Sequence, residues 1–342
     1  MTYAAGAEDG RTEDRTILAI DVGKSKCLVG LFVGTRRLED HRIAVTTADE
    51  TVAALEARVA DVFDRHRVGG IGLSVFGPVE TDPAQPDFGA IVASSEQQWS
   101  GVNLPAILSS RYGVSVRFDY DVNAAVLAEA RDREPGPAGF VYLSIGTGVG
   151  GAFHHPQEGI SPRTDPPQLG HISLPREPDD PYPGSCRFHG DCFQGLASGR
   201  ALFGRWGMPA HELPEDHEAW DLEARYIGRA CADLLYSTPH ATVRVGSGIA
   251  RVPGLVARSN YYLRAFMAEF PATLWRRIGE RDVIELAATA PESSLIGAAV
   301  LAGEEIGLEF APGGAARSSG LRGHRPAERA QCHGGLDQVA EL

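Results

Sequence analysis

The stretch from Gln168 to Cys192 constrains the fold of this chain more than any other part, because it places two histidines and two cysteines in a loop rich in proline and glycine. The four residues, His171, Cys186, His189 and Cys192, follow the spacing H-x14-C-x2-H-x2-C. Thiolate and imidazole ligands at such short intervals suit a tetrahedral zinc ion, and four protein ligands leave no open position for water. The motif therefore predicts a structural zinc ion that ties together a loop without a core of its own, rather than a catalytic metal.

Two other interpretations of these residues stay open. Cys186 and Cys192 could form a disulfide, or the four residues could be unrelated polar members of a loop. A disulfide needs an oxidising compartment, whereas the chain has 5 cysteines among 342 residues and a polar, acidic start unlike a secretory signal. Zinc is therefore the favoured interpretation.

Length and composition are those of a compact soluble protein. With 342 residues, 43% of them hydrophobic, the chain can bury the cores of two domains. No apolar run approaches the roughly 18 residues of a membrane helix. The formal net charge of -13 repels phosphate backbones and anionic lipids, so neither nucleic acid nor membrane is expected as a partner. We expect a cytoplasmic protein with disordered ends at residues 1–15 and 311–342, which lack hydrophobic periodicity.

Three glycine-containing turns follow predicted strands. They comprise residues 21–25, after the apolar run 16–20; residues 146–148, after 140–145; and residues 246–248, between 243–245 and a helix predicted to reach about Phe270. Such turns present backbone N–H groups to phosphate, and a carboxylate beside one can hold hydrated magnesium. Taken alone, each turn could equally be a plain tight connection.

One acidic residue, Asp121, stands between a predicted strand at residues 114–118 and a predicted helix. It could cap that helix, which would stabilise the helix by about 1 kcal/mol, or it could take part in catalysis. Its position alone does not decide between these two roles. Helical spacing also predicts helices at residues 49–66 and 294–302. Asn103 lies in an irregular loop of the kind where ligand contacts gather.

Taken together, the glycine turns, the aspartate and the metal motif resemble the ROK family of sugar kinases and repressors over about residues 17–302. The segments FDYDVNAAVLAE, YLSIGTGVGG, LGHI and CRFHGDCFQGLASG are most similar to its bacterial fructokinase branch. The resemblance implies an α/β fold of two actin/hexokinase-like, RNase H-like domains, with ATP and a sugar in the cleft between them. We expect a small domain at residues 16–118, to which a helix at about 294–304 returns, and a large domain at 119–293 that carries the zinc loop 168–192.

The resemblance also implies roles for individual residues. Asp121 would be the catalytic base that accepts the proton of the sugar hydroxyl, because phosphoryl transfer depends mainly on positioning and on Mg²⁺. His171 would contact the sugar as well as the zinc. ATP and Mg²⁺ would bind at Asp21, Gly23, Lys24 and Ser25, at Gly146, Thr147 and Gly148, and at Gly246, Ser247 and Gly248. The sugar would contact Asn103, Tyr120, Asp121, Gln168, His171 and Gln194, and we expect a homodimer.

The sequence departs from the family pattern at several of these positions. Gln168 and Gln194 stand where the family has glutamates that accept hydrogen bonds from the sugar, so two negative charges are missing. Tyr120 replaces a small polar residue, Lys24 replaces a glycine, and Ser247 interrupts the third glycine run. We therefore expect an ATP-dependent kinase of a hexose, fructokinase-like, or alternatively of a cyclitol or modified sugar. A catalytically silent sugar sensor is a third hypothesis. DNA binding is disfavoured, because the roughly twenty residues before Asp21 are too few for a helix-turn-helix domain.

Overall fold

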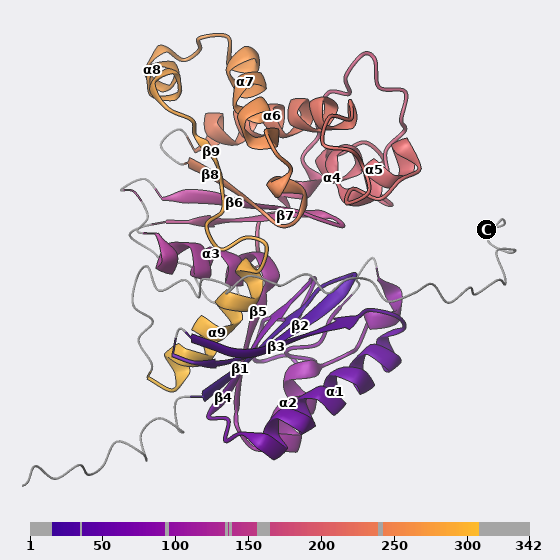
Figure 1. Ribbon diagram of the computed structural model, residues 1–342, viewed down its shortest axis with the longest axis vertical. Coiled ribbons are helices and arrows are strands. Elements are labelled where there is room, and N and C mark those ends of the chain that lie inside the picture. The colour runs from indigo at the N-terminus through magenta and orange to yellow at the C-terminus, as the bar shows by residue number, and fades with distance from the viewer. Residues whose placement is uncertain are drawn as a thin grey trace, which may run out of the picture.

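The computed structural model describes residues 16–34, 36–92, 96–133, 136, 139–155, 165–238 and 242–307. The predicted disordered ends lie outside these residues. Two β-sheets form the centres of two layered halves, with helices between and around them (Figure 1). No helix among the described residues is long and apolar enough to cross a membrane.

The first sheet has five strands in the order β3-β2-β1-β4-β5. They are β1 (Thr16–Val22), β2 (Lys26–Val33), β3 (Arg36–Ala44), β4 (Gly70–Val75) and β5 (Ser115–Tyr120). The first three strands are antiparallel neighbours, while β4 and β5 run parallel to β1. This arrangement brings the end of β1, where the first glycine turn begins, beside the ends of β4 and β5.

Both faces of this sheet are covered, because alternate residues of β1 belong to different cores. Leu18 and Ile20 pack in the core shared with α1 (Ala48–Arg65) and α2 (Leu104–Tyr112). Ile17 and Ala19 pack instead with α9 (Ser293–Glu305). The contact is close at Gly72 of β4, where an added Cβ would lie 1.8 Å from the carbonyl oxygen of Ala298. The predicted helix near residue 294 thus returns to the first sheet.

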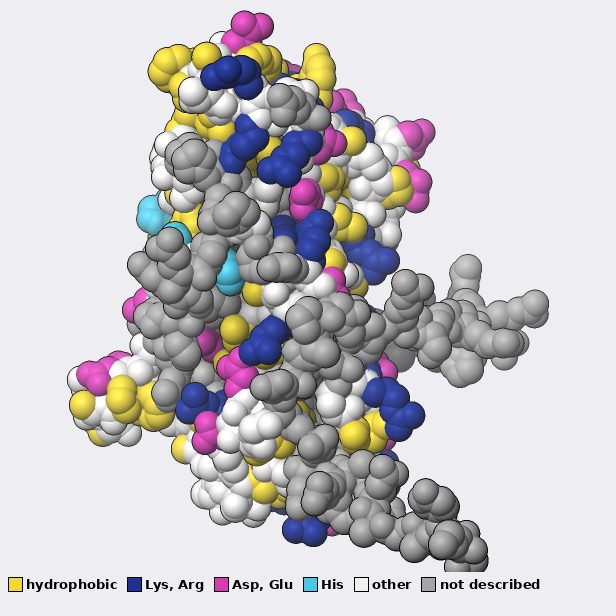
Figure 2. Space-filling model, turned by 90° about the vertical axis from the view of Figure 1, so that its left-hand side faces the viewer, with side chains coloured by type: hydrophobic (Ala, Val, Ile, Leu, Met, Phe, Trp, Pro, Cys, Tyr) yellow, Lys and Arg dark blue, Asp and Glu magenta, His cyan; other side chains and the backbone are white. Residues whose placement is uncertain are grey.

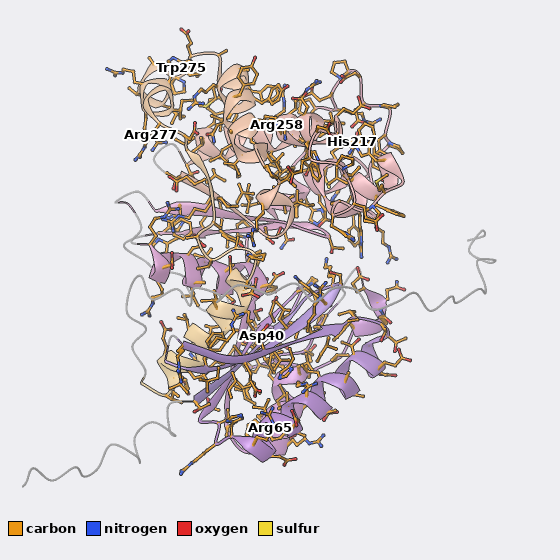
Figure 3. The ribbon with its side chains drawn as sticks, viewed as in Figure 1. Asp40, Arg65, His217, Arg258, Trp275 and Arg277 are labelled. Carbon is orange, nitrogen blue, oxygen red and sulfur yellow. The ribbon has the colours of Figure 1, made fainter. Side chains whose placement is uncertain are left out.

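The second sheet has four strands in the order β7-β6-β8-β9. They are β6 (Phe140–Ile145), β7 (Val149–His154), β8 (Thr242–Gly246) and β9 (Ile284–Leu286). One face packs on α6 (Ala219–Ser237) and α7 (Leu255–Met267), and the other on α3 (Asp121–Asp132). The shorter helical elements are η2 (Gln97–Trp99), η3 (Leu169–His171), α4 (Phe193–Ala197), α5 (Gly199–Trp206), η4 (Ile249–Arg251) and α8 (Ala272–Glu280). Trp275 and Arg277 on α8 lie at one end of the molecule, and Arg65 on α1 lies at the other (Figure 3).

Helix α3 joins the two halves, because it packs on the second sheet and crosses α9. At the crossing, an added Cβ on Gly297 would lie 1.8 Å from the carbonyl oxygen of Ala124. Farther along α3, the buried carboxylate of Glu129 accepts hydrogen bonds from the N–H of Thr289, at 2.7 Å, and from that of Ala288, at 3.1 Å. The helix is therefore fixed to the segment that leads into α9.

The predicted fold class is confirmed, and the predicted strands and helices are present with two differences. The third glycine turn does not open a long helix directly: η4 intervenes, and α7 begins only at Leu255, after Pro253 has removed a backbone donor. Strand β5 continues to Tyr120, past the domain boundary expected after residue 118, because its pairing with β4 extends to Val75. The division into two domains stays a prediction.

Candidate active site

The first two glycine turns come from different sheets and meet. In the first, the N–H of Gly23 donates to the carbonyl oxygen of Lys26 at 3.1 Å, which closes the β1–β2 hairpin. The Thr147 hydroxyl of the second turn lies 3.3 Å from the Ser25 hydroxyl of the first. Two predicted phosphate-binding turns thus face each other between the halves of the molecule.

The third turn lies against the second. Ser247 has a φ of 73°, in the left-handed region, and its hydroxyl donates to the carbonyl oxygen of Ile145. The second turn is also held from α5, because the N–H of Gly199 donates to the carbonyl oxygen of Gly146 at 2.7 Å. Gly246 cannot carry a side chain, since its Cβ would lie 2.0 Å from the Tyr142 hydroxyl. All three turns therefore belong to one site.

Two carboxylates, Asp21 and Asp121, lie beside these turns. Asp21 accepts a 2.5 Å hydrogen bond from Ser74, its neighbour across the parallel β1–β4 pair. Burial, helped by the charge of Asp121 and opposed by the bond from Ser74, raises the pKa of Asp21 to about 7. Asp121 is the first residue of α3, where its Oδ1 accepts from the N–H of Val122 at 2.9 Å. Burial also raises the pKa of Asp121 above its usual value.

Lys24, the residue that departs from the family pattern in the first turn, points into the same region. Its ammonium lies 5.8 Å from the centre of the Phe76 ring. Burial lowers the pKa of Lys24, and the charge of Asp121 opposes that shift. In turn, the charge of Lys24 opposes the rise that burial causes in the pKa of Asp121. The ammonium and the carboxylate therefore act on each other, although no hydrogen bond joins them among the described residues.

The predicted sugar-contacting residues differ in what their side chains already bind. The Oε1 of Gln194 accepts from the N–H of Val149 at 3.1 Å and lies beside Gly148, so this amide faces the second glycine turn. Gln168 is exposed, and its amide donates to the carbonyl oxygen of Pro166 at 3.2 Å.

The other two predicted contacts have structural partners as well. Asn103 caps α2 by accepting from the N–H of Ala106 at 3.0 Å, and it donates to the carbonyl oxygen of Phe88 at 2.8 Å. The buried Tyr120 hydroxyl donates to Asp165 at 2.6 Å and bonds to the backbone of Val79. These bonds fix loops around the site, so sequence reasoning missed the capping and anchoring functions of Asn103 and Tyr120.

The four predicted metal ligands do converge. The ligand atoms of His171, Cys186, His189 and Cys192 all lie within 4.8 Å of one another. The Nδ1 of His171 is 3.6 Å from each cysteine sulfur and 3.2 Å from the Nδ1 of His189. Ligands at bond lengths of about 2.0–2.3 Å on a tetrahedron are separated by about 3.3–3.8 Å, so the donor set fits zinc. Both cysteines are free thiols, and the alternative of a disulfide between them is absent from this structure.

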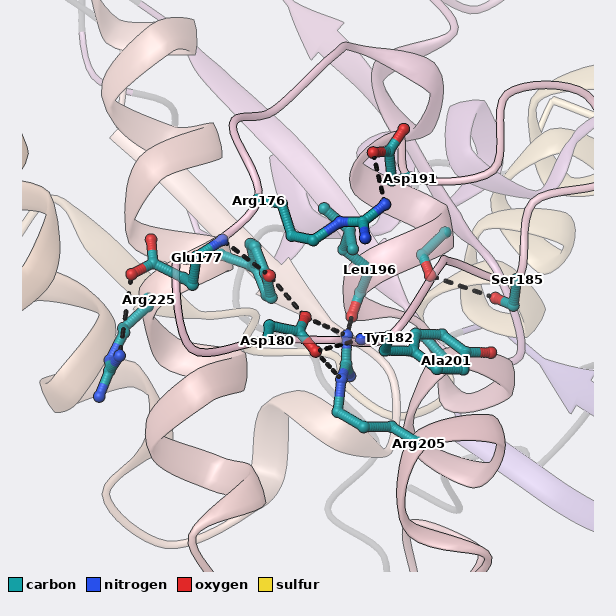
Figure 4. Close-up of polar contacts among 12 residues, drawn as sticks. Arg176, Glu177, Asp180, Tyr182, Ser185, Asp191, Leu196, Ala201, Arg205 and Arg225 are labelled. Carbon is teal, nitrogen blue, oxygen red and sulfur yellow. Dashed lines mark hydrogen bonds and ion pairs between the residues drawn. The ribbon is translucent and has the colours of Figure 1, made fainter.

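A buried ion pair anchors the loop that carries these ligands (Figure 4). The guanidinium of Arg205 on α5 donates to both carboxylate oxygens of Asp180, at 3.0 and 2.9 Å, and to the carbonyl oxygen of Leu196 at 3.0 Å. The Tyr226 hydroxyl donates to the same carboxylate at 2.6 Å. Burial alone would raise the pKa of Asp180, but the hydrogen bonds from Arg205 and Tyr226 outweigh it and lower this pKa. This network holds the middle of the loop on α5 and α6.

A pocket opens where the glycine turns meet the metal loop. It is lined by Lys24, Thr147, Gly148, Ser185, Cys186, Arg187, Phe188, Gln194, Ser198 and Arg200. Ser74, Ser185, Arg187, Phe188, Ser198 and Arg200 were not predicted. Arg187 and Phe188 lie between two metal ligands and could have been found from that position; Ser74 required the strand pairing, which the sequence does not give.

A pair of sheets with these strand orders, whose glycine turns face each other, belongs to the actin/hexokinase-like class of fold. Within this class the chain belongs to the ROK family, whose family model matches residues 17–305. A Bacillus subtilis (strain 168) relative, provisionally named a fructokinase, is 31% identical over 300 residues, or 86% of this chain and 97% of the relative. The fructokinase of Zymomonas mobilis is 28% identical over 83% of this chain and 95% of its own length.

A solved structure supports the fold independently. The ROK hexokinase from Thermus thermophilus superposes with a TM-score of 0.61 at 25% identity, covering 85% of this chain and 99% of its own.

Proposed function

We propose that the protein is an ATP-dependent sugar kinase that transfers the γ-phosphoryl group to a hydroxyl of a hexose, as a fructokinase does. The family and its fructokinase relatives support an ATP-dependent carbohydrate kinase. The observation that carries the proposal is the contact of Ser25 with Thr147, at 3.3 Å, because it brings two phosphate-binding turns together beside Asp121. Phosphoryl transfer needs this kind of convergence, since it relies on positioning and charge stabilisation.

In the proposed reaction, Asp121 accepts the proton of the attacking hydroxyl. The hydroxyl oxygen then bonds to the γ-phosphorus, the bond from this phosphorus to the bridging oxygen breaks, and ADP leaves with the electron pair. Backbone N–H groups of Gly146–Gly148 would hold donor phosphates, and residues 246–248 would border the adenosine. Lys24 would face the negative charge of the transferred group.

Two metals fit the residues present. Asp21 would hold Mg²⁺, since one of its carboxylate oxygens has no hydrogen-bond donor among the described residues. Bound Mg²⁺ neutralises phosphate charge. Zinc would occupy the site of His171, Cys186, His189 and Cys192 and would tie the loop together. Metal analysis of the purified protein should find about one zinc per chain, and its absence would remove this site from the proposal.

For the acceptor, we propose contacts with Asp121, His171, Gln168 and Gln194, while Asn103 and Tyr120 fix the surrounding loops. The amides at positions 168 and 194, in place of carboxylates, favour a cyclitol or modified sugar as the alternative to an ordinary hexose.

We further expect that the protein is a homodimer and that it is located in the cytoplasm. The face shown in Figure 2 carries both basic and acidic side chains. We expect no nucleic-acid partner, because the formal net charge is -13.

The test is ATP turnover across a panel of hexoses and cyclitols, comparing the wild type with Asp121→Asn. Loss of the base should lower kcat by a factor on the order of 10²–10⁴ on the accepted substrate. Binding of a non-hydrolysable ATP analogue should stay within about threefold, because the glycine turns are intact. A wild type that binds sugars and ATP without turnover would instead identify a sugar sensor, and an Asp121→Asn variant with full turnover would exclude Asp121 as the base.

A further inference from the structure

Two groups of residues from different segments help to line the pocket between the glycine turns and the metal loop, and we call them its two walls. Thr147 and Gly148 of the second glycine turn contribute to one wall. Arg187 and Phe188 contribute to the other, and they lie between the metal ligands Cys186 and His189. If the first wall holds donor phosphates, the second faces the acceptor.

The lining of this pocket is cationic. Lys24, Arg187 and Arg200 are its charged residues, and no aspartate or glutamate is among the described residues that line it. Arg200 is paired with Glu96, at 2.6 Å between Nη2 and Oε1. The charge of Asp121 opposes the effect of burial, which lowers the pKa of Lys24. Arg187 is exposed and makes no hydrogen bond or ion pair with any described residue, so its guanidinium is available to a ligand.

The proposed donor phosphates have partners other than Arg187. They would be met by the N–H groups of the second turn and by Lys24 from the first, whereas Arg187 is on the metal loop. Beside it, Phe188 is 64% exposed at the pocket and presents an aromatic surface of the kind that lines small-molecule sites. A guanidinium and an aromatic ring on the acceptor wall suit a ligand with both an anionic group and a ring.

We infer that the acceptor is an anionic sugar or cyclitol, one that carries a carboxylate or phosphate group in addition to the hydroxyl that is phosphorylated. Arg187 binds the anionic group through its two parallel N–H donors, which match a carboxylate or a phosphate, and Lys24 and Arg200 add positive charge to the same pocket. This inference rests on the proposed kinase function, and it names the substrate class of that site.

The experiment compares matched pairs of acceptors on the full-length protein with MgATP. Glucuronate is compared with glucose, and fructose 6-phosphate with fructose, by measuring ADP release. We expect kcat/KM for at least one anionic member to exceed that of its neutral parent by about tenfold or more. In Arg187→Ala, the loss for that anionic acceptor should exceed the loss for the parent by a similar factor. Arg187→Lys should retain only part of the preference, because lysine keeps the positive charge but lacks the two parallel N–H donors of the guanidinium.

Arg176→Ala is the control, since Arg176 lies on the same loop, pairs with Asp191 and does not line the pocket. It should leave the preference unchanged. A neutral parent preferred over both anionic partners, or a preference that Arg187→Ala does not alter, would overturn the inference while leaving the kinase intact. A rise in the KM for MgATP alone in Arg187→Ala would show that the pocket serves only the donor, which also overturns it.

If no acceptor is phosphorylated, the proposed function fails, and calorimetric binding decides the inference separately. Glucuronate is the probe here, because a sugar phosphate could bind as a reaction product. Binding of glucuronate that is at least about tenfold tighter than that of glucose, and is lost in Arg187→Ala, would support the anionic class. Equal binding of the two would overturn it.

Discussion

At the scale of single residues, the proposed role of Asp121 as the base depends on its neighbour Lys24, which replaces a glycine of the family pattern. Burial raises the pKa of the Asp121 carboxyl, which would keep a base protonated at low pH. The charge of Lys24 opposes this effect. A lysine in the first glycine turn therefore helps Asp121 to remain ionised in a partly buried site.

This balance predicts how activity depends on pH. A base works when deprotonated, so kcat/KM should fall as the pH drops through the pKa of Asp121, at a higher pH than for an ordinary aspartate. This fall is the acid limb of the pH–rate profile.

Replacing Lys24 with methionine removes the effect that lowers the pKa of Asp121, and the acid limb should therefore move to higher pH. Turnover at alkaline pH should also fall, by a factor on the order of 10², because a cation facing the transferred group is lost. A pH–rate profile of Lys24→Met with an unmoved acid limb would show that the two groups do not interact.

Gln168 and Gln194 are the positions at which we expect single residues to affect substrate specificity. Gln194 uses its amide oxygen to accept from the N–H of Val149, and a glutamate could keep that bond. The substitution would add negative charge to a pocket that contains Lys24, Arg187 and Arg200.

We therefore predict that Gln168→Glu/Gln194→Glu raises kcat/KM for fructose by about tenfold or more, with the double variant exceeding either single one if both residues contact the same end of the ligand. The measurement is ADP release with fructose and with the preferred substrate. Equal kcat/KM for fructose in the wild type and the double variant would show that the glutamines do not select the substrate.

At the scale of elements, the loop from residue 168 to residue 192 combines a proposed zinc site with an anchor made of protein side chains. The side chains of Arg205 and Asp180 are only 7% and 0% exposed, whereas those of Arg176 and Asp191, at the edge of the loop, are 35% and 47% exposed. Removing one partner of a buried pair leaves an uncompensated charge, but an exposed pair is solvated and contributes little. Figure 4 shows both pairs: Arg176, Asp180 and Asp191 belong to the loop, and Arg205 belongs to α5.

Arg205→Ala should accordingly lower the free energy of unfolding by about 3–5 kcal/mol, and Arg176→Ala by at most about 1 kcal/mol. Chemical denaturation measures both, and metal content measured in parallel shows whether the anchor also supports zinc binding. Similar losses in the two variants would contradict the assignment of Asp180 and Arg205 as the anchor.

The same loop shows what sequence can and cannot predict. The spacing of Cys186, His189 and Cys192 was sufficient to predict that these three side chains converge, because residues separated by two others in a tight loop must lie close together. His171, which fourteen residues separate from Cys186, joins them through the fold of the loop. The anchor was not predictable, since Asp180 and Arg205 are both ordinary charged residues and their pairing depends on how α5 packs. The direction of Gln194 was likewise missed: a motif places it beside the site, but only the fold turns its amide toward Val149.

At the scale of the whole molecule, the active site requires two sheets to keep a fixed relation, and α3 supports it. This helix carries Asp121 at its first residue and is buried against the second sheet and α9. Glu129, two turns farther on, accepts three hydrogen bonds from Ala288 and Thr289, and its carboxylate lies 3.8 Å from the Arg244 guanidinium. The position of Asp121, the proposed base, thus depends on a contact distant in sequence.

Replacing Glu129 with glutamine should disturb this relation without a large change in shape. An amide retains one acceptor oxygen, but its N–H2 group would face the backbone donors of Ala288 and Thr289, and Arg244 would lose its buried counter-charge. We expect the free energy of unfolding to fall by about 3 kcal/mol. We also expect kcat to fall by about tenfold or more at temperatures where the variant is folded, because a small displacement of a catalytic group costs rate steeply.

Arg131→Ala is the matched control for this prediction. Arg131 lies on the same helix and pairs with Glu304 of α9, but the two side chains are 38% and 45% exposed, so its loss should cost at most about 1 kcal/mol and leave kcat unchanged. Urea unfolding and steady-state turnover of both variants separate the effects on stability and on catalysis. If Glu129→Gln unfolds like Arg131→Ala and turns over like the wild type, the buried contact does not position Asp121, and the packing of α3 on α9 alone maintains the relation between the two sheets.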